Sequence, residues 1–248
     1  MWDNPRVLNA AAGTLTGLAL LLFLAGALRL LFVSPLFPLR EIDVRGTLAH
    51  IGRADIEKAS RGSVHGNFFA ANLGALRAAL QQLPWVRSVD VRRIWPDRLQ
   101  VSIEEHVALA RWGDAALVDT HGDLFAGSSD AKLPLLAGPP GTEHEVTARY
   151  RLFAQLLAPL ATPLERVILS PRYAWQLRLA NGLDIELGRD LATDPVDARL
   201  ARFVAVYPAL RSDMAQRAQY VDLRYPNGFA LRLPDSGRDG KAAASAKG

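Results

Sequence analysis

The chain begins with one long apolar stretch and continues with short segments in which apolar and polar residues alternate. Val7–Leu28 holds 22 residues without a charged side chain. A helix of that length extends about 33 Å at about 1.5 Å per residue, which is enough to cross a hydrocarbon core of about 30 Å. Arg29 follows where its long side chain can reach the headgroups, and apolar residues continue to Val33. We therefore predict one membrane-spanning helix over residues 7–33, after a tail of residues 1–6.

A cleaved signal peptide is the rival interpretation of this stretch, because Ala25–Ala27 fits a small-residue cleavage site. The apolar stretch is longer than the about 7–15 residues of a signal-peptide core, so we favour an uncleaved anchor. The flanking charges leave the orientation open. Arg6 precedes the span, whereas Arg40 and Arg45 follow it, and large C-terminal domains cross membranes largely regardless of their charge.

Residues 37–107 carry the pattern of a small two-layer domain. Alternation predicts three strands, at residues 41–45, 89–91 and 99–104, with a turn at 95–97 before the last of them. Two helices are predicted after the first strand, one over residues 53–60 and one that begins after the N-cap Asn72 and ends at Pro84. The inward positions of these helices are Ile56, Ala59, Leu73, Leu76, Leu80 and Leu83. Two helices on one face of three strands form a compact domain.

Residues 108–234 predict a second, β-rich domain. Ala116–Asp119 and Leu124–Phe125 form a hairpin across residues 120–122, and a Gly- and Pro-rich loop occupies Leu136–Gly141. An amphipathic helix follows, with Val146, Tyr150, Phe153, Leu157 and Leu160 directed inward.

Two further hairpins enclose another helix. That helix has Asp194 as N-cap and Pro195 at its first position, and its apolar residues are Val196, Leu200, Phe203 and Tyr207. We expect this helix, the preceding one, or both to cover the apolar face of an antiparallel sheet.

The register of the two hairpins follows from their apolar positions. A two-residue Asn181-Gly182 loop would pair Leu179 with Asp184 and mix apolar and charged residues on one face. A three-residue loop pairs Leu179 with Leu183 and Leu177 with Ile185 instead. By the same reasoning, a Pro226–Gly228 loop pairs Tyr225 with Phe229 and Leu223 with Leu231. Each hairpin then has one apolar face and one polar face.

Composition excludes several classes of protein. The chain has 248 residues, 50% of them apolar, so it is not wholly disordered, although the small polar tail at residues 235–248 is predicted to be disordered. The formal charge of +4 is weak over this length, and no dense basic block with interleaved aromatic residues predicts a nucleic-acid partner. The absence of cysteine excludes disulfides, thiolate metal sites and cysteine nucleophiles.

No combination of residues predicts catalysis, a cofactor or a metal ion. His121 lies between Asp119 and Asp123 in a turn, which is typical of turn chemistry. Ser102 and Ser170 lack a glycine-elbow context, and no glycine-rich segment has a phosphate-binding pattern. The chain has five histidines, and their spacing is not that of metal ligands: His50, His65, His106, His121 and His144.

The order of elements after the span resembles a POTRA domain, a protein-interaction module. The segments that carry this likeness are FPLREIDVRG and NLGALRAALQQLPWVRSVDVRRIWPDRLQVSIEEH. The segment LPWVRSVDVRRIWPDRLQVSIEEHVALARW resembles the FtsQ/DivIB family of bacterial cell division proteins. The later segments SPRYAWQLRLANGLDIELGR, RLARFVAVYPAL and YVDLRYPNGFALRL resemble the same family, so the likeness covers residues 37–233.

The resemblance implies a non-enzymatic, α+β, bitopic scaffold of the inner membrane at the division septum. It places residues 1–6 in the cytoplasm as a tail shorter than the family usually has, residues 7–33 in the bilayer, and both domains in the periplasm. It also implies that the last strands form a sheet edge that binds an FtsB-like partner, itself bound to an FtsL-like protein, by strand addition, while the POTRA-like domain contacts other division proteins. The matching partner-binding positions are Arg224, Tyr225, Asn227, Gly228, Phe229, Ala230 and Leu231, with Arg172 as a weaker basic candidate.

Two other functions remain as alternatives. A POTRA adaptor for the secretion or assembly of outer-membrane proteins would use the first domain to bind unfolded strands. A cell-wall hydrolase or transferase would need paired acid and base groups, which the sequence does not offer.

Overall fold

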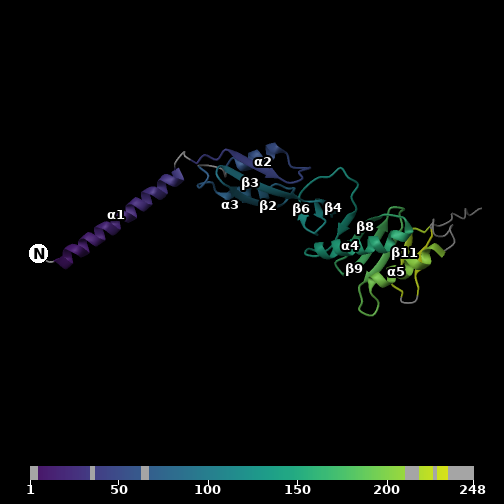
Figure 1. Ribbon diagram of the computed structural model, residues 1–248. Coiled ribbons are helices and arrows are strands. Elements are labelled where there is room, and N and C mark those ends of the chain that lie inside the picture. The colour runs from purple at the N-terminus through teal and green to yellow at the C-terminus, as the bar shows by residue number, and fades with distance from the viewer. Residues whose placement is uncertain (1–4, 34–36, 63–66, 210–217, 226–227, 234–248) are drawn as a thin grey trace, which may run out of the picture. The chain divides into compact units, whose positions relative to one another are not determined.

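The computed structural model describes residues 5–33, 37–62, 67–209, 218–225 and 228–233. The chain divides into two units between His106 and Val107. Each unit has its own hydrophobic core. The thin grey trace in Figure 1 marks the residues outside the described ranges.

The first unit opens with α1 (Pro5–Val33), the long helix at the N-terminal end in Figure 1. Its Leu8–Leu30 segment is long and apolar enough to cross a membrane, and none of it is buried against the rest of the protein. This matches the apolar stretch that predicts a single membrane-spanning helix. The apolar side chains of this segment are exposed, and exposure of such a surface to water is unfavourable.

The remainder of the first unit has two layers. Three strands, β1 (Glu41–Arg45), β2 (Val86–Ile94) and β3 (Arg98–Glu105), form a sheet of order β1-β3-β2 with β1 parallel to β3. Two helices, α2 (Arg53–Ser60) and α3 (Leu73–Gln81), contribute Ile56, Leu76 and Leu80 to the core. Asn72 is the N-cap of α3, since its side chain accepts a hydrogen bond of 3.0 Å from the Ala75 amide. The predicted strands, helices, cap and turn are therefore confirmed in this unit.

The second unit is built on one sheet, and its strand order in the described chain is β12-β11-β10-β9-β8-β7-β4-β5-β6. Its first strands are β4 (Ala108–Trp112), β5 (Ala116–Asp119), β6 (Leu124–Phe125), β7 (Leu135–Ala137) and β8 (Leu164–Leu169). The others are β9 (Ala174–Leu179), β10 (Asp184–Arg189), β11 (Tyr220–Asp222) and β12 (Ala230–Arg232). Two helices, α4 (Glu143–Leu157) and α5 (Val196–Val206), are each followed by a short 3-10 helix, Ala158–Leu160 and Tyr207–Ala209.

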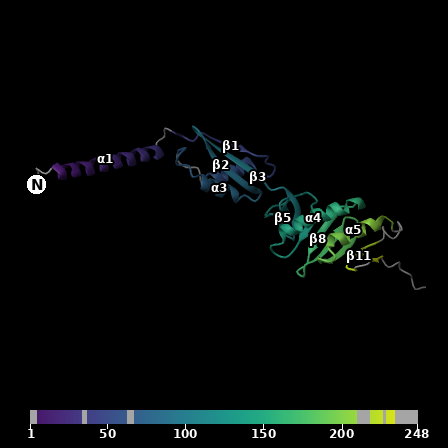
Figure 2. The same cartoon turned by 60° about the horizontal axis from the view of Figure 1, so that its bottom comes forward.

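Both helices cover the same face of this sheet (Figure 2). The helix α4 connects β7 to its parallel neighbour β8, and α5 connects β10 to its parallel neighbour β11. All four strands run in one direction and both connections move the same way across the sheet, so connections of one hand place both helices on one face. The core between the layers includes Val146, Phe153, Leu200 and Phe203.

The structure corrects three expectations for this unit. The sheet is mixed rather than antiparallel, because α4 and α5 serve as crossovers between parallel strands. The predicted loop at Leu136–Gly141 begins inside β7, a three-residue strand too short to show alternation. Asp194 is not the N-cap of α5. That position is occupied by Pro195, and Asp190 Oδ1 accepts from the Val196 amide at 3.1 Å, while Asp194 binds Arg199 and Arg202.

The predicted register is right for one hairpin and wrong for the other. Leu177 pairs with Ile185, and the Leu179 amide donates to the Leu183 carbonyl at 2.9 Å, so the three-residue loop is confirmed. In the last hairpin, Val221 pairs with Leu231. The pairing is displaced by two residues from the prediction and the connection is longer. A shift of two preserves the faces, so the apolar residues still lie on the helix side.

We predict that Gly46→Ala destabilises the first unit. Gly46 has φ +141°, and a Cβ atom there would lie 2.2 Å from the backbone oxygen of Ile103. A strained backbone and a clash with a neighbouring strand together cost about 2–4 kcal/mol of unfolding free energy. Hydrogen exchange of the β1 and β3 amides in the full chain measures the loss. Gly62→Ala is the matched control, because a Cβ there meets nothing within 4 Å, and equal exchange in the two variants would contradict the prediction.

Candidate interaction edge

The strand β12 lies at the edge of the second sheet. It pairs antiparallel with β11 on one side, and the described chain places no strand on its other side. This is the position that the family resemblance implies for the last strand. A strand edge carries backbone donors and acceptors that require water or another chain as partner.

The direction of these backbone groups follows from one hydrogen bond. The Gln219 amide donates to the Arg232 carbonyl at 3.1 Å, so the backbone polar groups of Arg232 are directed toward β11. Successive residues of a strand direct their backbone groups to opposite sides. The N–H and C=O groups of Leu231 are therefore directed to the open side of β12. Leu231 offers a donor and an acceptor spaced for an added strand.

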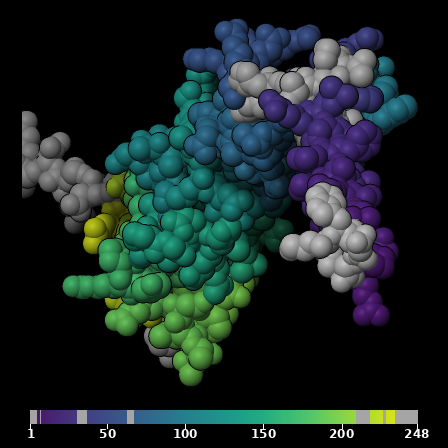
Figure 3. Space-filling view, turned by 90° about the vertical axis from the view of Figure 1, so that its left-hand side faces the viewer, coloured from purple at the N-terminus to yellow at the C-terminus, as the bar shows by residue number. Residues whose placement is uncertain are grey.

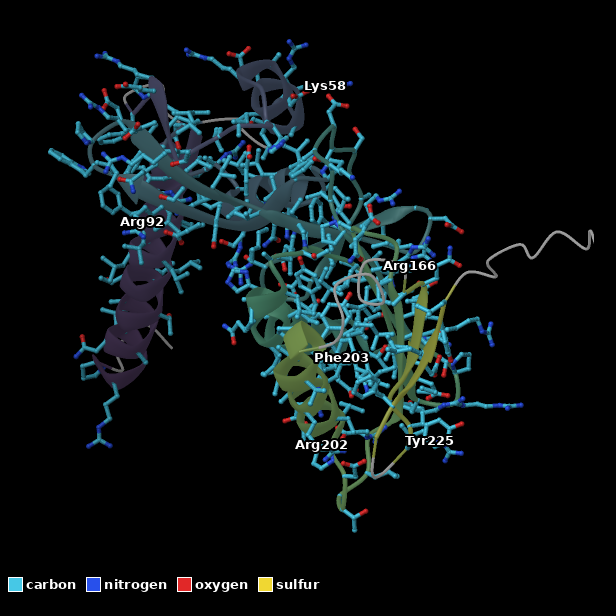
Figure 4. The ribbon with its side chains drawn as sticks, turned by 90° about the vertical axis from the view of Figure 1, so that its right-hand side faces the viewer. Lys58, Arg92, Arg166, Arg202, Phe203 and Tyr225 are labelled. Carbon is cyan, nitrogen blue, oxygen red and sulfur yellow. The ribbon has the colours of Figure 1, made fainter. Side chains whose placement is uncertain are left out.

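The apolar side chains near the edge pack on their own unit. Phe229 is half-buried, and its ring meets Phe203 of α5 in a T-shaped contact with centroids 5.4 Å apart. Leu231 packs against the same core. Figure 4 labels Phe203 on α5, facing the yellow strands. Phe229 and Leu231 thus hold the last hairpin in place, which differs from a role in which their side chains project toward a partner.

The polar face carries Arg224, fixed by the carboxylate of Asp222. Arg224 donates from Nε to Oδ1 at 2.9 Å and from Nη2 to Oδ2 at 2.6 Å, and its backbone amide also donates to Oδ1 at 3.0 Å. These hydrogen bonds from Arg224 lower the pKa of Asp222 against the effect of its burial, and the same pairing raises the pKa of Arg224. The Arg224 side chain is nevertheless 58% exposed.

A glycine explains how Arg224 reaches this position. Gly188 lies at an irregularity of the β9–β10 pairing with φ +75°, and a Cβ atom there would lie 2.9 Å from Cγ of Arg224. The aliphatic part of Arg224 therefore lies across Gly188. Neither Gly188 nor Asp222 is among the site residues predicted from the sequence. The signal for Asp222 is present there, because residues two apart on a strand share a face and Asp222 and Arg224 have opposite charges.

The remaining site residues predicted from the sequence differ in their surroundings. Tyr225 follows Arg224 and is 54% exposed, and Figure 4 labels it near the end of the yellow strands. Gly228 and Ala230 are also exposed, whereas Asn227 lies outside the described residues. Yellow residues reach the surface in the space-filling view (Figure 3).

Arg172 does not lie on the edge strand. It is exposed in the turn between β8 and β9, and β10 and β11 separate β9 from β12 in the sheet order. Ala174 pairs with Arg189 at one end of β10, and Leu223 bonds to Glu186 near that same end. Arg172 therefore shares an end of the sheet with Arg224 and is three strand positions away from β12, about 14 Å at about 4.8 Å per strand.

The Asp119–Asp123 turn has an internal explanation. Asp119 is fully buried, and its Oδ1 accepts from the amides of His121 at 2.7 Å and Asp123 at 2.9 Å. Within the described ranges, no group of three His, Asp or Glu side chains is arranged to hold a metal ion.

We predict that Asp222→Asn lowers the stability of the second unit at neutral pH by about 1 kcal/mol. The loss is no larger because water around the exposed Arg224 side chain screens part of the charged hydrogen bond. The pKa of Asp222 is lower in the folded state than in the unfolded state. Its stabilisation is therefore complete above the unfolded pKa of about 3.9 and is lost as the pH falls through the folded pKa. Urea unfolding at pH 7 and at pH 3 should show the difference from the unsubstituted chain shrink at the lower pH.

Asp184→Asn is the control for this substitution. Asp184 and Arg178 form a pair on the same face with side chains 44% and 38% exposed. We expect a change of at most about 0.5 kcal/mol there. A pH-independent effect of Asp222→Asn would contradict the linkage.

Comparison with known proteins agrees with this architecture. Residues 37–106 match the FtsQ-type POTRA domain, and residues 110–224 match the C-terminal domain of cell division protein FtsQ/DivIB. The chain is 44% identical over 235 residues to the cell division protein FtsQ of Burkholderia pseudomallei, covering 94% of each chain. It is 41% identical over 237 residues to that of Nitrosospira multiformis, covering 94% of this chain and 99% of the relative. The chain belongs to the FtsQ family of cell division proteins.

Proposed function

We propose that this chain is a non-enzymatic scaffold of the division machinery that recruits FtsB-like and FtsL-like membrane proteins by strand addition at β12. The observation that carries the proposal is the open side of β12, to which the backbone N–H and C=O of Leu231 are directed. A partner strand paired there would extend the sheet and satisfy groups that otherwise bond to water.

Side chains around the edge supply specificity for such a partner. Ala230 and Arg232 are exposed, and the small Ala230 leaves room for a partner side chain. Tyr225 offers an exposed aromatic ring at one end of the edge. Arg224 presents a guanidinium that Asp222 already orients, which lowers the entropy lost when a partner carboxylate joins it. Arg172, at the same end of the sheet, attracts acidic residues of a longer partner segment.

The membrane anchor places the scaffold near its partners. We propose that α1 spans the inner membrane once, with residues 1–6 cytoplasmic and both folded units periplasmic, at the division septum. The fully exposed apolar surface of α1 supports the span. Confinement to one bilayer raises the effective concentration of partners anchored in the same membrane, so a modest interface is sufficient.

The first unit is the proposed contact for other division proteins. A groove of about 710 Å³ runs between the edge strand β1 and α2, and its apolar lining includes Ile42, Val44 and Ile56. Several charged residues at its rim are paired, as Arg53 is with Glu57 at 3.3 Å and Glu41 with Arg98 at 3.3 Å. A groove of this kind fits an apolar segment of a protein partner and offers no basic surface for a nucleic acid.

We predict that a photo-crosslinking amino acid at Ala230 captures the FtsB-like partner in cells and that one at Leu124 does not. Leu124 lies on β6, at the opposite edge of the same sheet, and is 43% exposed. It is therefore a matched control for exposure and edge position.

Leu231→Pro in the Ala230-labelled chain removes the backbone N–H donor that is directed to the open side of β12. Loss of about 1.4 kcal/mol would reduce capture about tenfold.

Leu231→Ala separates the backbone effect from packing, because it keeps the N–H group and removes the side chain. We expect capture to persist in this variant. Equal capture from Ala230 and Leu124, or equal losses in Leu231→Pro and Leu231→Ala, would contradict strand addition at β12.

We also predict that Tyr225→Ala weakens partner binding by about 2 kcal/mol, about 30-fold in Kd, if its ring is an interface anchor. The ring is 54% exposed and belongs to neither hydrophobic core, so thermal unfolding should be unchanged. Titration of the partner's periplasmic segment against the purified chain measures the affinity. Leu124→Ala is the control and should bind like the unsubstituted chain. An unchanged Kd for Tyr225→Ala would remove Tyr225 from the interface.

A further inference from the structure

Two large apolar residues that are consecutive in the sequence are exposed where β2 ends and the turn to β3 begins. Trp95 is 76% exposed and Ile94 is 40% exposed. Neither residue belongs to the hydrophobic core of the described first unit. Every other described tryptophan is at least half-buried: Trp85, Trp112 and Trp175. An exposed indole beside an exposed isoleucine forms an apolar tip without a packing role in its own unit.

Hydrogen bonds fix this tip to the segment that follows α1. The Arg40 amide donates to the Asp97 carbonyl at 3.0 Å, which joins the turn to the chain just before β1. Arg93 donates from Nε to the Phe68 carbonyl at 2.9 Å and from Nη2 to the Ala71 carbonyl at 2.8 Å. The turn, the 68–71 segment and the start of β1 are therefore one connected structure.

The same structure includes Phe37. The Phe68 amide donates to the Phe37 carbonyl at 2.9 Å, and the Phe37 and Phe69 rings pack edge to face with centroids 5.2 Å apart. Phe37 follows the end of α1 at Val33 by four residues. Four residues extend at most about 14 Å, at about 3.3–3.6 Å each. The covalent chain alone therefore keeps this end of the first unit close to the membrane surface in which α1 ends.

Charge around the tip suits a phosphate-bearing surface. Four guanidinium groups, those of Arg40, Arg92, Arg93 and Arg98, surround the turn, against the carboxylates of Glu41, Asp90 and Asp97. The side chains of Arg40 and Arg98 are 73% and 57% exposed, so they keep donors available for lipid phosphates. Tryptophan is enriched at the headgroup level of bilayers because its ring is apolar and its N–H is polar.

We infer that Ile94 and Trp95 insert into the headgroup region of the bilayer that α1 spans, with Arg40 and Arg98 on lipid phosphates. This inference rests on the membrane span of the proposed function and adds a second, reversible membrane contact. Two contacts, one covalently continuous with the span and one at the turn, restrict the tilt of the first unit relative to the bilayer. The ligand of this surface is the lipid headgroup region itself.

Tryptophan quenching by brominated lipid tests the inference. The full chain is placed in lipid nanodiscs in which the upper acyl chains are brominated or unmodified. We expect bromination to quench both Trp2, which is next to the span in the sequence, and Trp95 in the unsubstituted chain, and we expect Trp95→Phe to lose the share of the quenching that Trp95 contributes. Trp112→Phe removes a tryptophan of the second unit, and the quenching by brominated lipid should persist in this variant. Trp95→Phe retains an aromatic ring at an exposed position, so its thermal unfolding should match that of the unsubstituted chain.

Three results would overturn the inference. Equal quenching in Trp95→Phe and the unsubstituted chain would place the indole outside the headgroups while leaving the proposed function intact. Protection of Trp95 that appears only after a partner protein is added would assign the tip to a protein interface. Failure of the chain to co-elute with nanodiscs would refute the membrane span as well, and with it the topology of the proposed function.

Discussion

The proposed interaction of the second unit depends on the backbone hydrogen-bonding groups at the outer side of its edge strand. Backbone polar groups inside the sheet are satisfied by neighbours, whereas those on the outer side of an edge strand bond to water until another chain replaces it. Replacement of water adds little free energy for each hydrogen bond. The interaction gains strength and direction only when the edge is already held in an extended conformation, because its ordering entropy has then been lost during folding. Packing of Phe229 on Phe203 provides that order.

The same edge could also promote aggregation. An exposed edge strand can pair with the identical strand of another copy of the chain, and proteins limit such pairing by short edge strands and charged residues. Here β12 has three residues and ends at Arg232. Short length limits random pairing, while arginines of like charge on two copies repel each other. A partner with acidic residues meets no such repulsion, so one set of charges favours the partner and opposes self-association.

Elements with a long periodicity are predictable from the sequence, whereas those decided by tertiary neighbours are not. The helices with Leu76 and Phe153 in their apolar faces and the Leu177–Ile185 hairpin follow from spacing alone. The strand at Leu135–Ala137 is too short for a period, and its pairing with two parallel neighbours forms only in the folded sheet. The predicted N-cap of α5 is wrong because Asp190, from the preceding strand end, satisfies the Val196 amide.

The candidate site, too, combines features that could be predicted from the sequence with others that depend on tertiary contacts. The edge position of the last strand in the described chain is the one that the resemblance implies. The inward packing of Phe229 and the pairing of Arg224 with Asp222 could not be predicted from the order of residues. Phe229 depends on a helix about 25 residues earlier in the chain, and the Arg224 geometry depends on the missing side chain of Gly188. Both are contacts between elements rather than properties of one segment.

Because β12 comes last in chain order among the described strands, the proposed docking edge can be completed only after the other described strands have been synthesised. A nascent or C-terminally cleaved chain that lacks β12 would present β11 instead, with a different alternation of side chains and without Leu231. Such a chain would keep its anchor and the buried residues of its core but would lose Leu231, which packs against that core. Under the proposed function it would be a poor ligand for the partner. A copy can then join the assembly only after translation has passed through the last strand.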